Sequence, residues 1–104
     1  MIVDLRHPLD FLAVPRTLPN ALRMNPDEVT KRWAELPANR DIVVYCTCPN
    51  EETSVMVAKQ LRQLGVMRVR PLAGGLAGWE SLGFPMDRRF EDDGRPLKVM
   101  IKVS

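Results

Sequence analysis

The sequence predicts an α/β domain in which a mostly parallel central sheet is flanked by helices. Two observations lead to this prediction. Short apolar runs typical of buried strands occur at residues 1–5, 41–45 and 66–72. Segments with helical spacing of apolar residues alternate with these runs along the chain. In such sheets a ligand site lies beyond the carboxyl ends of the strands, which directs attention to the loops that follow them.

The first strand is expected at residues 1–5, almost at the first residue. Three prolines interrupt the stretch that follows, so residues 7–24 are predicted to be mostly loop, with one helical turn at 10–13. A helix then begins cleanly, because Asn25 suits the N-cap and Glu28 the capping-box position. The apolar positions that follow at helical spacing, and that we expect to face the core, are Val29, Trp33 and Leu36.

Residues 41–45 are a β-branched apolar run without polar alternation, so we expect a central strand covered on both faces. The next helix is expected to be capped by Thr53 or Ser54 and to stop at Gly65. Its predicted buried stripe consists of Val55, Ala58, Leu61 and Leu64.

A further strand is predicted within residues 66–72, followed by a tight turn at Gly74 and Gly75. A short helix at 76–82 should place Trp79 in the core. We therefore assign residues 1–86 to the domain and residues 87–104 to a C-terminal loop and extension. Residues 87–96 are polar and charged, as in a surface loop, and 97–103 alternate in the manner of an edge strand or a docking extension.

The composition excludes several classes of protein. A chain of 104 residues suits one domain with a modest core, and 45% hydrophobic with 27% charged residues is typical of soluble proteins. The net charge of +2 is too small to argue for nucleic acid. The sequence contains neither a run of eighteen apolar residues nor a signal segment, so we expect a cytoplasmic domain that does not itself span a membrane.

The residues that carry chemistry are two cysteines one residue apart, Cys46 and Cys48. They cannot make a disulfide framework, and with one lone histidine, His7, they offer too few ligands for zinc, so no metal or cofactor is expected. A loop between a parallel strand and a helix gathers unpaired N–H groups, and the helix dipole favours an anion there. A thiol in such a loop should have a lowered pKa, which indicates thiol chemistry.

Cys48 is the preferred nucleophile and Cys46 the second choice. Cys46 continues the apolar strand, which favours a small buried residue, whereas Cys48 stands in the loop. Such a loop would also stabilise a persulfide or a bound sulfur oxyanion. The residues expected to bind the substrate or the persulfide are Pro49, Asn50, Glu51, Glu52, Thr53 and Ser54.

Four segments in order resemble the rhodanese-like family of sulfurtransferases. Residues 41–46 resemble the strand before the rhodanese active-site loop, and 72–79 the family's leucine, double-glycine, tryptophan signature. Residues 3–6 with 10–11 are similar to its aspartate-arginine strand and the acidic-aromatic pair that follows. Residues 17–21 stand where the family has a His-Ile-Pro-Gly-Ala turn. The closest likeness is to members with a Cys-x-Cys-Pro-Asn loop.

The resemblance implies a three-layer fold and an enzyme that accepts sulfane sulfur on a loop cysteine. The donor would be thiosulfate or a persulfide, and the acceptor a thiol or a protein. It also implies that the family's usual first strand and helix are missing before Ile2, so we expect a piece of a longer protein. Some relatives with this loop are joined to membrane-embedded domains. The spacing from Cys48 to Gly65 matches the family without a gap.

The loop departs from the family in its charges. Glu51 and Glu52 stand where Arg or Lys is frequent, and their charge should raise a thiol pKa and repel an anionic donor. As first-turn helix residues that point away, they would instead favour the helix dipole. Ser54 stands where related phosphatases have an arginine, so phosphoryl transfer is not expected.

Two other functions remain open. A Cys46–Cys48 redox module is one, although an extended strand holds such residues farther apart than a disulfide tolerates. A catalytically inactive interaction module is the other, and the two glutamates favour it. Arg6 either supports the active site or pairs with Asp4 or Asp10.

Overall fold

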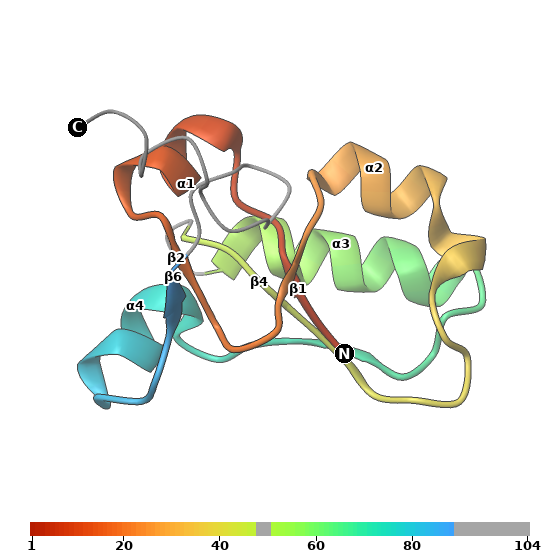
Figure 1. Ribbon diagram of the computed structural model, residues 1–104. Helices are drawn as coiled ribbons and strands as arrows, with labels where there is room; N and C mark the ends of the chain where they lie inside the picture. The colour runs from red at the N-terminus through yellow and green to blue at the C-terminus, as the bar shows by residue number, and fades with distance from the viewer. Residues whose placement is uncertain (48–50, 89–104) are drawn as a thin grey trace.

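The computed structural model (Figure 1) describes residues 1–47 and 51–88. It contains a sheet of four parallel strands in the order β3-β1-β4-β5. A separate antiparallel pair is formed by β2 and β6. The strands are β1 (Ile2–Asp4), β2 (Arg16–Thr17), β3 (Leu22–Arg23), β4 (Ile42–Tyr45), β5 (Val69–Pro71) and β6 (Asp87–Arg88). The predicted α/β class with a mostly parallel sheet is confirmed.

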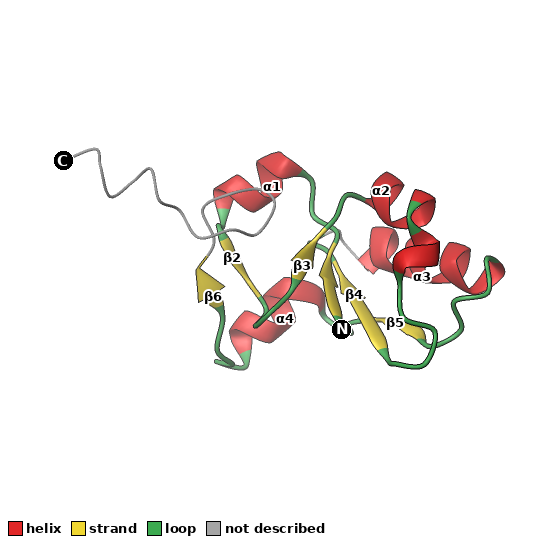
Figure 2. Cartoon of the chain, turned by 45° about the vertical axis from the view of Figure 1, so that its right-hand side comes forward, coloured by secondary structure: helices red, strands yellow, loops and turns green. Residues whose placement is uncertain are grey.

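Helices cover both faces of the sheet (Figure 2). They are α1 (Pro8–Ala13), α2 (Pro26–Lys31), α3 (Glu52–Gln63) and α4 (Gly75–Ser81), with a 3₁₀ turn, η1 (Trp33–Glu35), after α2. Side chains of a strand alternate between its faces, so the two faces build separate cores. The larger core lies between the sheet and the helices α2 and α3, and the smaller one lies against α4.

The larger core is purely apolar and fully enclosed. Its members are Val3, Leu5, Met24, Val29, Leu36, Ile42, Val44, Val57, Ala58, Leu61, Val66 and Val69. The smaller core consists of Leu18, Ala21, Tyr45 and Leu76, with Ile2, Leu72, Trp79 and Met86 packed against it. Because β4 contributes to both cores, its sequence is apolar without alternation, as predicted for a central strand.

The predicted start of α2 is confirmed, but the helix ends at Lys31, before two of its three predicted apolar positions, Trp33 and Leu36. The Asn25 N–H donates to the Glu28 carboxylate at 3.0 Å, which completes the capping box. The helix then tightens into η1, and Trp33 is 39% exposed, so its predicted place in the core is wrong. The helix ends at Lys31 and Arg32 has φ −101° and ψ 25°, so the helical spacing from Val29 to Trp33 is broken.

The buried face of α3 differs from the predicted stripe by about one position. Ala58 and Leu61 are buried as predicted, whereas Val55 and Leu64 are 48% and 41% exposed. The face that packs consists of Ser54, Val57, Ala58 and Leu61. Because the first buried position is a serine, the pattern of apolar residues alone does not identify this stripe.

Segment 7–24 is more ordered than predicted. The helical turn expected at 10–13 is the full helix α1, which begins at Pro8, where a proline costs the helix no hydrogen bond. Strands β2 and β3 were not predicted, because a strand of two residues has no periodicity. Residues 87 and 88, predicted as loop, form β6 against β2.

The remaining predictions for the C-terminal part, the rest of the loop 87–96 and a strand at 97–103, lie outside the described residues. The division at residue 86 therefore stays a prediction. Among the described residues, none of the helices combines the length and hydropathy that a bilayer crossing needs.

Helix α3 ends as the sequence predicts, and the geometry allows a quantitative test. Gly65 has φ +103°, its N–H donates to the Arg62 carbonyl at 3.1 Å, and the Val66 N–H donates to the Leu61 carbonyl at 2.9 Å. These two bonds form a Schellman motif.

We expect Gly65→Ala to destabilise the domain by about 1–2 kcal/mol, because alanine is strained at this φ although no atom lies near its methyl group. Urea unfolding would measure the change. Gly78→Ala is the matched control, since its methyl group meets only the Ala73 carbonyl at 3.6 Å inside a helix. The control should be neutral or stabilising by up to about 1 kcal/mol; equal losses in both variants would contradict the assignment.

Candidate active site

The predicted cysteine loop leaves β4 at the carboxyl edge of the sheet and leads into α3. The structure describes its two ends, Cys46 with Thr47 on one side and Glu51 on the other. Cys48, Pro49 and Asn50, which include the preferred nucleophile, lie outside the described residues. The site can therefore be built from what holds the two ends of the loop.

The first end is held by the turn that leads into α4, residues 74–76, which comprises the N-cap and the first two residues of that helix. Cys46 is 2% exposed, and its carbonyl accepts the Leu76 N–H at 3.4 Å. Gly75 lies directly against the same carbonyl, at φ +57°, and a Cβ on Gly75 would be 2.5 Å from the Cys46 oxygen. A side chain at residue 75 would thus displace the end of β4, which explains why this position is glycine.

The second end is held by the neighbouring residue of the same turn. Glu51 is the N-cap of α3 and adopts a left-handed conformation with φ +59°. Its side-chain carboxylate accepts the Gly74 N–H at 3.1 Å, and its carbonyl accepts the Ser54 hydroxyl at 3.1 Å. The predicted capping by Thr53 or Ser54 is therefore wrong, because both residues lie inside the first turn of the helix.

The two glutamates of the loop have different environments. Glu51 is half-buried and bonded to Gly74, whereas Glu52 is exposed in the first turn of α3. An acidic side chain in that turn interacts favourably with the helix dipole. The expectation that both glutamates behave as first-turn residues is thus met by Glu52, and Glu51 instead acts as a bridge between two loops.

A buried charged cluster lies at the ends of β1, β3 and β4. The Asp4 carboxylate, with no exposed surface, accepts the Tyr45 hydroxyl at 2.6 Å and an N–H of Arg23 at 3.2 Å. Arg6 donates to it from Nε at 3.0 Å and from Nη2 at 2.9 Å. The Asp4 carboxylate thus pairs with two guanidinium groups, those of Arg6 and Arg23.

Further hydrogen bonds of the two arginines connect this cluster to residues 14–16 and to the backbone of Arg6. Arg6 donates to the carbonyls of Val14 at 2.9 Å and Arg16 at 2.7 Å. Arg23 donates to the Arg6 carbonyl at 2.7 Å. Both guanidinium carbons lie over the Phe11 ring, at 5.3 Å and 4.6 Å from its centroid, within cation–π range.

Tyr45 takes both hydrogen-bond roles within the cluster. Its hydroxyl donates to Asp4 and accepts the Leu18 N–H at 3.2 Å. Burial, together with the charge and hydrogen bond of Asp4, raises the pKa of Tyr45 far above its usual range. Tyr45 therefore stays neutral and serves as a fixed donor rather than as an acid or base.

Sequence reasoning found part of this cluster. Of the alternatives open for Arg6, the structure has the pairing with Asp4 rather than Asp10. Arg23 and Tyr45 were missed. One signal was available: two buried strands each end in a polar residue, and Asp4 and Tyr45 are register partners in the sheet.

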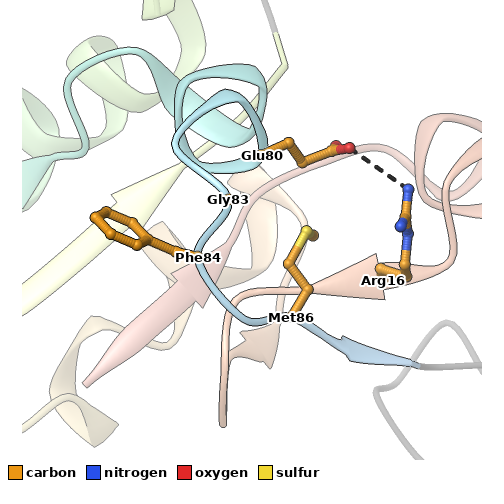
Figure 3. Close-up of a pocket in the computed structure, with 5 residues that line it drawn as sticks. All are labelled: Arg16, Glu80, Gly83, Phe84 and Met86. Carbon is orange, nitrogen blue, oxygen red and sulfur yellow. Dashed lines mark hydrogen bonds and ion pairs between the residues drawn. The ribbon is translucent and has the colours of Figure 1, made fainter.

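A surface hollow of about 250 Å³ lies apart from the predicted site residues, at the C-terminal end of α4 (Figure 3). The residues that line it are Arg16, Glu80, Gly83, Phe84 and Met86. Arg16 and Glu80 form an exposed ion pair at 3.4 Å across it. The Phe84 ring points away from that pair and packs edge-on against Trp79.

Comparison with known proteins agrees with this architecture. The family model described as "Rhodanese-like domain" matches residues 1–82. A protein of Allochromatium vinosum named sulfurtransferase is 31% identical over 86 residues, which cover 83% of this chain and 77% of that protein. An uncharacterised protein of Synechocystis sp. is 30% identical, and this chain spans 54% of its length.

Solved structures show the same fold. The Rhodanese_3-like domain of the Alr3790 protein from Anabaena sp. superposes with a TM-score of 0.75 at 27% identity, covering 88% of this chain and 94% of that domain. A rhodanese-related protein of Thermoplasma volcanium has a TM-score of 0.69 at 23% identity, covering 83% of this chain and 81% of its own.

The charged cluster predicts a large effect of neutralising Asp4. Asp4→Asn removes the buried carboxylate that pairs with both Arg6 and Arg23, and we expect a loss of about 3–5 kcal/mol in the free energy of unfolding. Tyr45→Phe removes the two hydrogen bonds of the hydroxyl, to Asp4 and from Leu18, and should lose about 1–3 kcal/mol. Urea unfolding followed by far-UV circular dichroism would measure both.

Asp41→Asn is the control, because Asp41 pairs with Arg68 at 3.1 Å on the surface, where both side chains are more than half exposed. Its unfolding midpoint should stay close to that of the unsubstituted domain. If Asp4→Asn were no more damaging than this control, the cluster would not hold the strands as described.

Proposed function

This chain belongs to the rhodanese-like domain family, and from that premise we propose that it is a sulfurtransferase that carries sulfane sulfur as a persulfide on Cys48. The family match and the sulfurtransferase of Allochromatium vinosum support sulfur transfer at the level of the family. The choice of cysteine, donor and acceptor goes beyond them.

The burial of Cys46 is the observation that carries the choice of Cys48. Cys46 is 2% exposed in the strand end, and its carbonyl is fixed by Leu76. A buried thiol in such a position reacts slowly, since a nucleophilic thiolate needs solvent access and nearby positive potential. The other cysteine stands in a loop that ends at the N-terminus of a twelve-residue helix, where N–H groups favour an anion.

The proposed reaction has two displacement steps at sulfur. The Cys48 thiolate attacks the outer sulfur of thiosulfate, so that a new S–S bond forms while the donor S–S bond breaks and sulfite leaves with its electron pair. An acceptor thiolate or cyanide then attacks the outer sulfur of the persulfide, and Cys48 leaves as a thiolate. Neither step requires an external oxidant, because the donor already carries sulfane sulfur.

The loop residues have supporting roles in this proposal. Backbone N–H groups from Asn50 to Ser54 would hold the persulfide anion. The Ser54 hydroxyl is directed back to the Glu51 carbonyl at 3.1 Å, which favours a role in shaping the loop. Arg6 is enclosed by Asp4 and two carbonyls, so we assign it to the support of the strand ends rather than to the substrate.

The proposed donors are thiosulfate or a persulfide, and the acceptors a thiol or a protein. We place the reaction in the cytoplasm, where thiols remain reduced and free to accept sulfur.

Mass spectrometry after treatment with a sulfur donor tests the proposal directly. The domain, Cys46→Ser and Cys48→Ser are each treated with thiosulfate and, separately, with cysteine persulfide. We expect a gain of one sulfur in the unsubstituted domain and in Cys46→Ser, its absence in Cys48→Ser, and its discharge by cyanide as thiocyanate.

Each other outcome has a distinct meaning. Sulfur uptake that persists in Cys48→Ser and vanishes in Cys46→Ser would move the nucleophile to Cys46. A Cys46–Cys48 disulfide formed on oxidation, with no sulfur uptake, would favour the redox module. No uptake from either donor and no disulfide would overturn the sulfurtransferase and leave an interaction module.

A further inference from the structure

We propose that Glu51 is a positioning residue for sulfur transfer, because its carboxylate fastens the cysteine loop to the turn before α4. The inference rests on the proposed function for its catalytic consequence. The contact between Glu51 and Gly74 is a feature of the structure in its own right.

The backbone of Glu51 indicates that this position is under constraint. Its φ of +59° is a conformation that residues with a side chain rarely adopt and that glycine adopts freely. A glutamate at such a position needs compensation from its side chain. The hydrogen bond from the Gly74 N–H, at 3.1 Å, is the contact that the side chain makes there.

The same turn holds both ends of the cysteine loop. Gly74 binds the Glu51 carboxylate, while Gly75 and Leu76 meet the Cys46 carbonyl. The two attachment points, Gly74 on one side and Gly75 with Leu76 on the other, are adjacent in sequence. Fixing both ends of a short loop reduces the conformations open to the residues between them.

Of these two attachments, only one depends on the identity of a loop side chain. The Cys46 end is held through its backbone, which most substitutions would preserve. The Glu51 end is held through a carboxylate at the end of a two-carbon arm, so Glu51→Gln keeps an acceptor of equal length and Glu51→Ala removes it. The negative charge of Glu51 and its role as an acceptor can therefore be separated by substitution.

Sulfur-transfer kinetics with cysteine persulfide and cyanide would test the proposal. We expect Glu51→Gln to stay within about twofold of the unsubstituted domain in kcat and Glu51→Ala to fall by about fivefold or more, with most of the loss in kcat, because a displaced nucleophile reacts less often once substrate is bound. Glu51→Gly should fall equally, although glycine tolerates the left-handed backbone. Glu35→Ala, which removes an exposed carboxylate that pairs with Arg32 outside the cysteine loop, is the matched control and should keep its rate.

A Glu51→Gly variant with unchanged kcat would overturn the proposal, since it lacks the side chain without straining the backbone. A fivefold loss in Glu51→Gln as well would also overturn it and assign the effect to charge. Rescue by glutamine with loss in both alanine and glycine is the pattern that a general loss of stability would not produce.

A second measurement tests the hydrogen bond between Glu51 and Gly74 independently of sulfur transfer. Hydrogen exchange of the Gly74 amide should be slow in the unsubstituted domain and in Glu51→Gln, and faster in Glu51→Ala and Glu51→Gly. If the domain transfers no sulfur while this pattern holds, the proposed function fails and the contact stands. If sulfur is transferred through Cys48 and exchange at Gly74 is the same in all four proteins, the positioning role fails alone.

Discussion

The arrangement of the strand ends depends on one buried carboxylate. Asp4 on β1 accepts hydrogen bonds from Arg23 on β3 and from Tyr45 on β4, so it joins three adjacent strands at their carboxyl edge. An unpaired charge in such a place is costly, and the observed partners of Asp4 relieve that cost. The cluster therefore specifies where these strands end relative to one another, which hydrophobic packing alone would leave less well defined.

This constraint reaches the cysteine loop through β4. The residue after Tyr45 is Cys46, whose carbonyl meets the turn that precedes α4, and the same turn receives Glu51 from the far end of the loop. One end of the loop thus follows a strand end that is held by buried charged groups. The other end is held by a side-chain hydrogen bond at the start of α3. Glycine at residues 74 and 75 makes this closeness possible, since both have positive φ and Gly75 leaves no space for a methyl group.

The parts of the fold that sequence predicts are those with a local cause. The apolar run of β4, the capping box at Asn25 and the glycine stop at Gly65 each follow from neighbouring residues alone. The missed parts depend on distant partners: β3 has two residues and is a strand because β1 lies beside it. Ser54 replaces an apolar residue on the buried face of α3, and the left-handed Glu51 is stabilised by a residue 23 positions away. Cys48 remains a prediction from spacing and resemblance.

The acidic loop does not by itself argue against an anionic intermediate. Glu51 directs its carboxylate to the Gly74 N–H, and Glu52 is exposed in the first turn of α3, where water and salt screen its charge. At the strand ends, Arg6 and Arg23 both pair with the buried Asp4 carboxylate. The helix start adds a positive partial charge. The start of α3 is thus a source of positive potential for the persulfide proposed on Cys48.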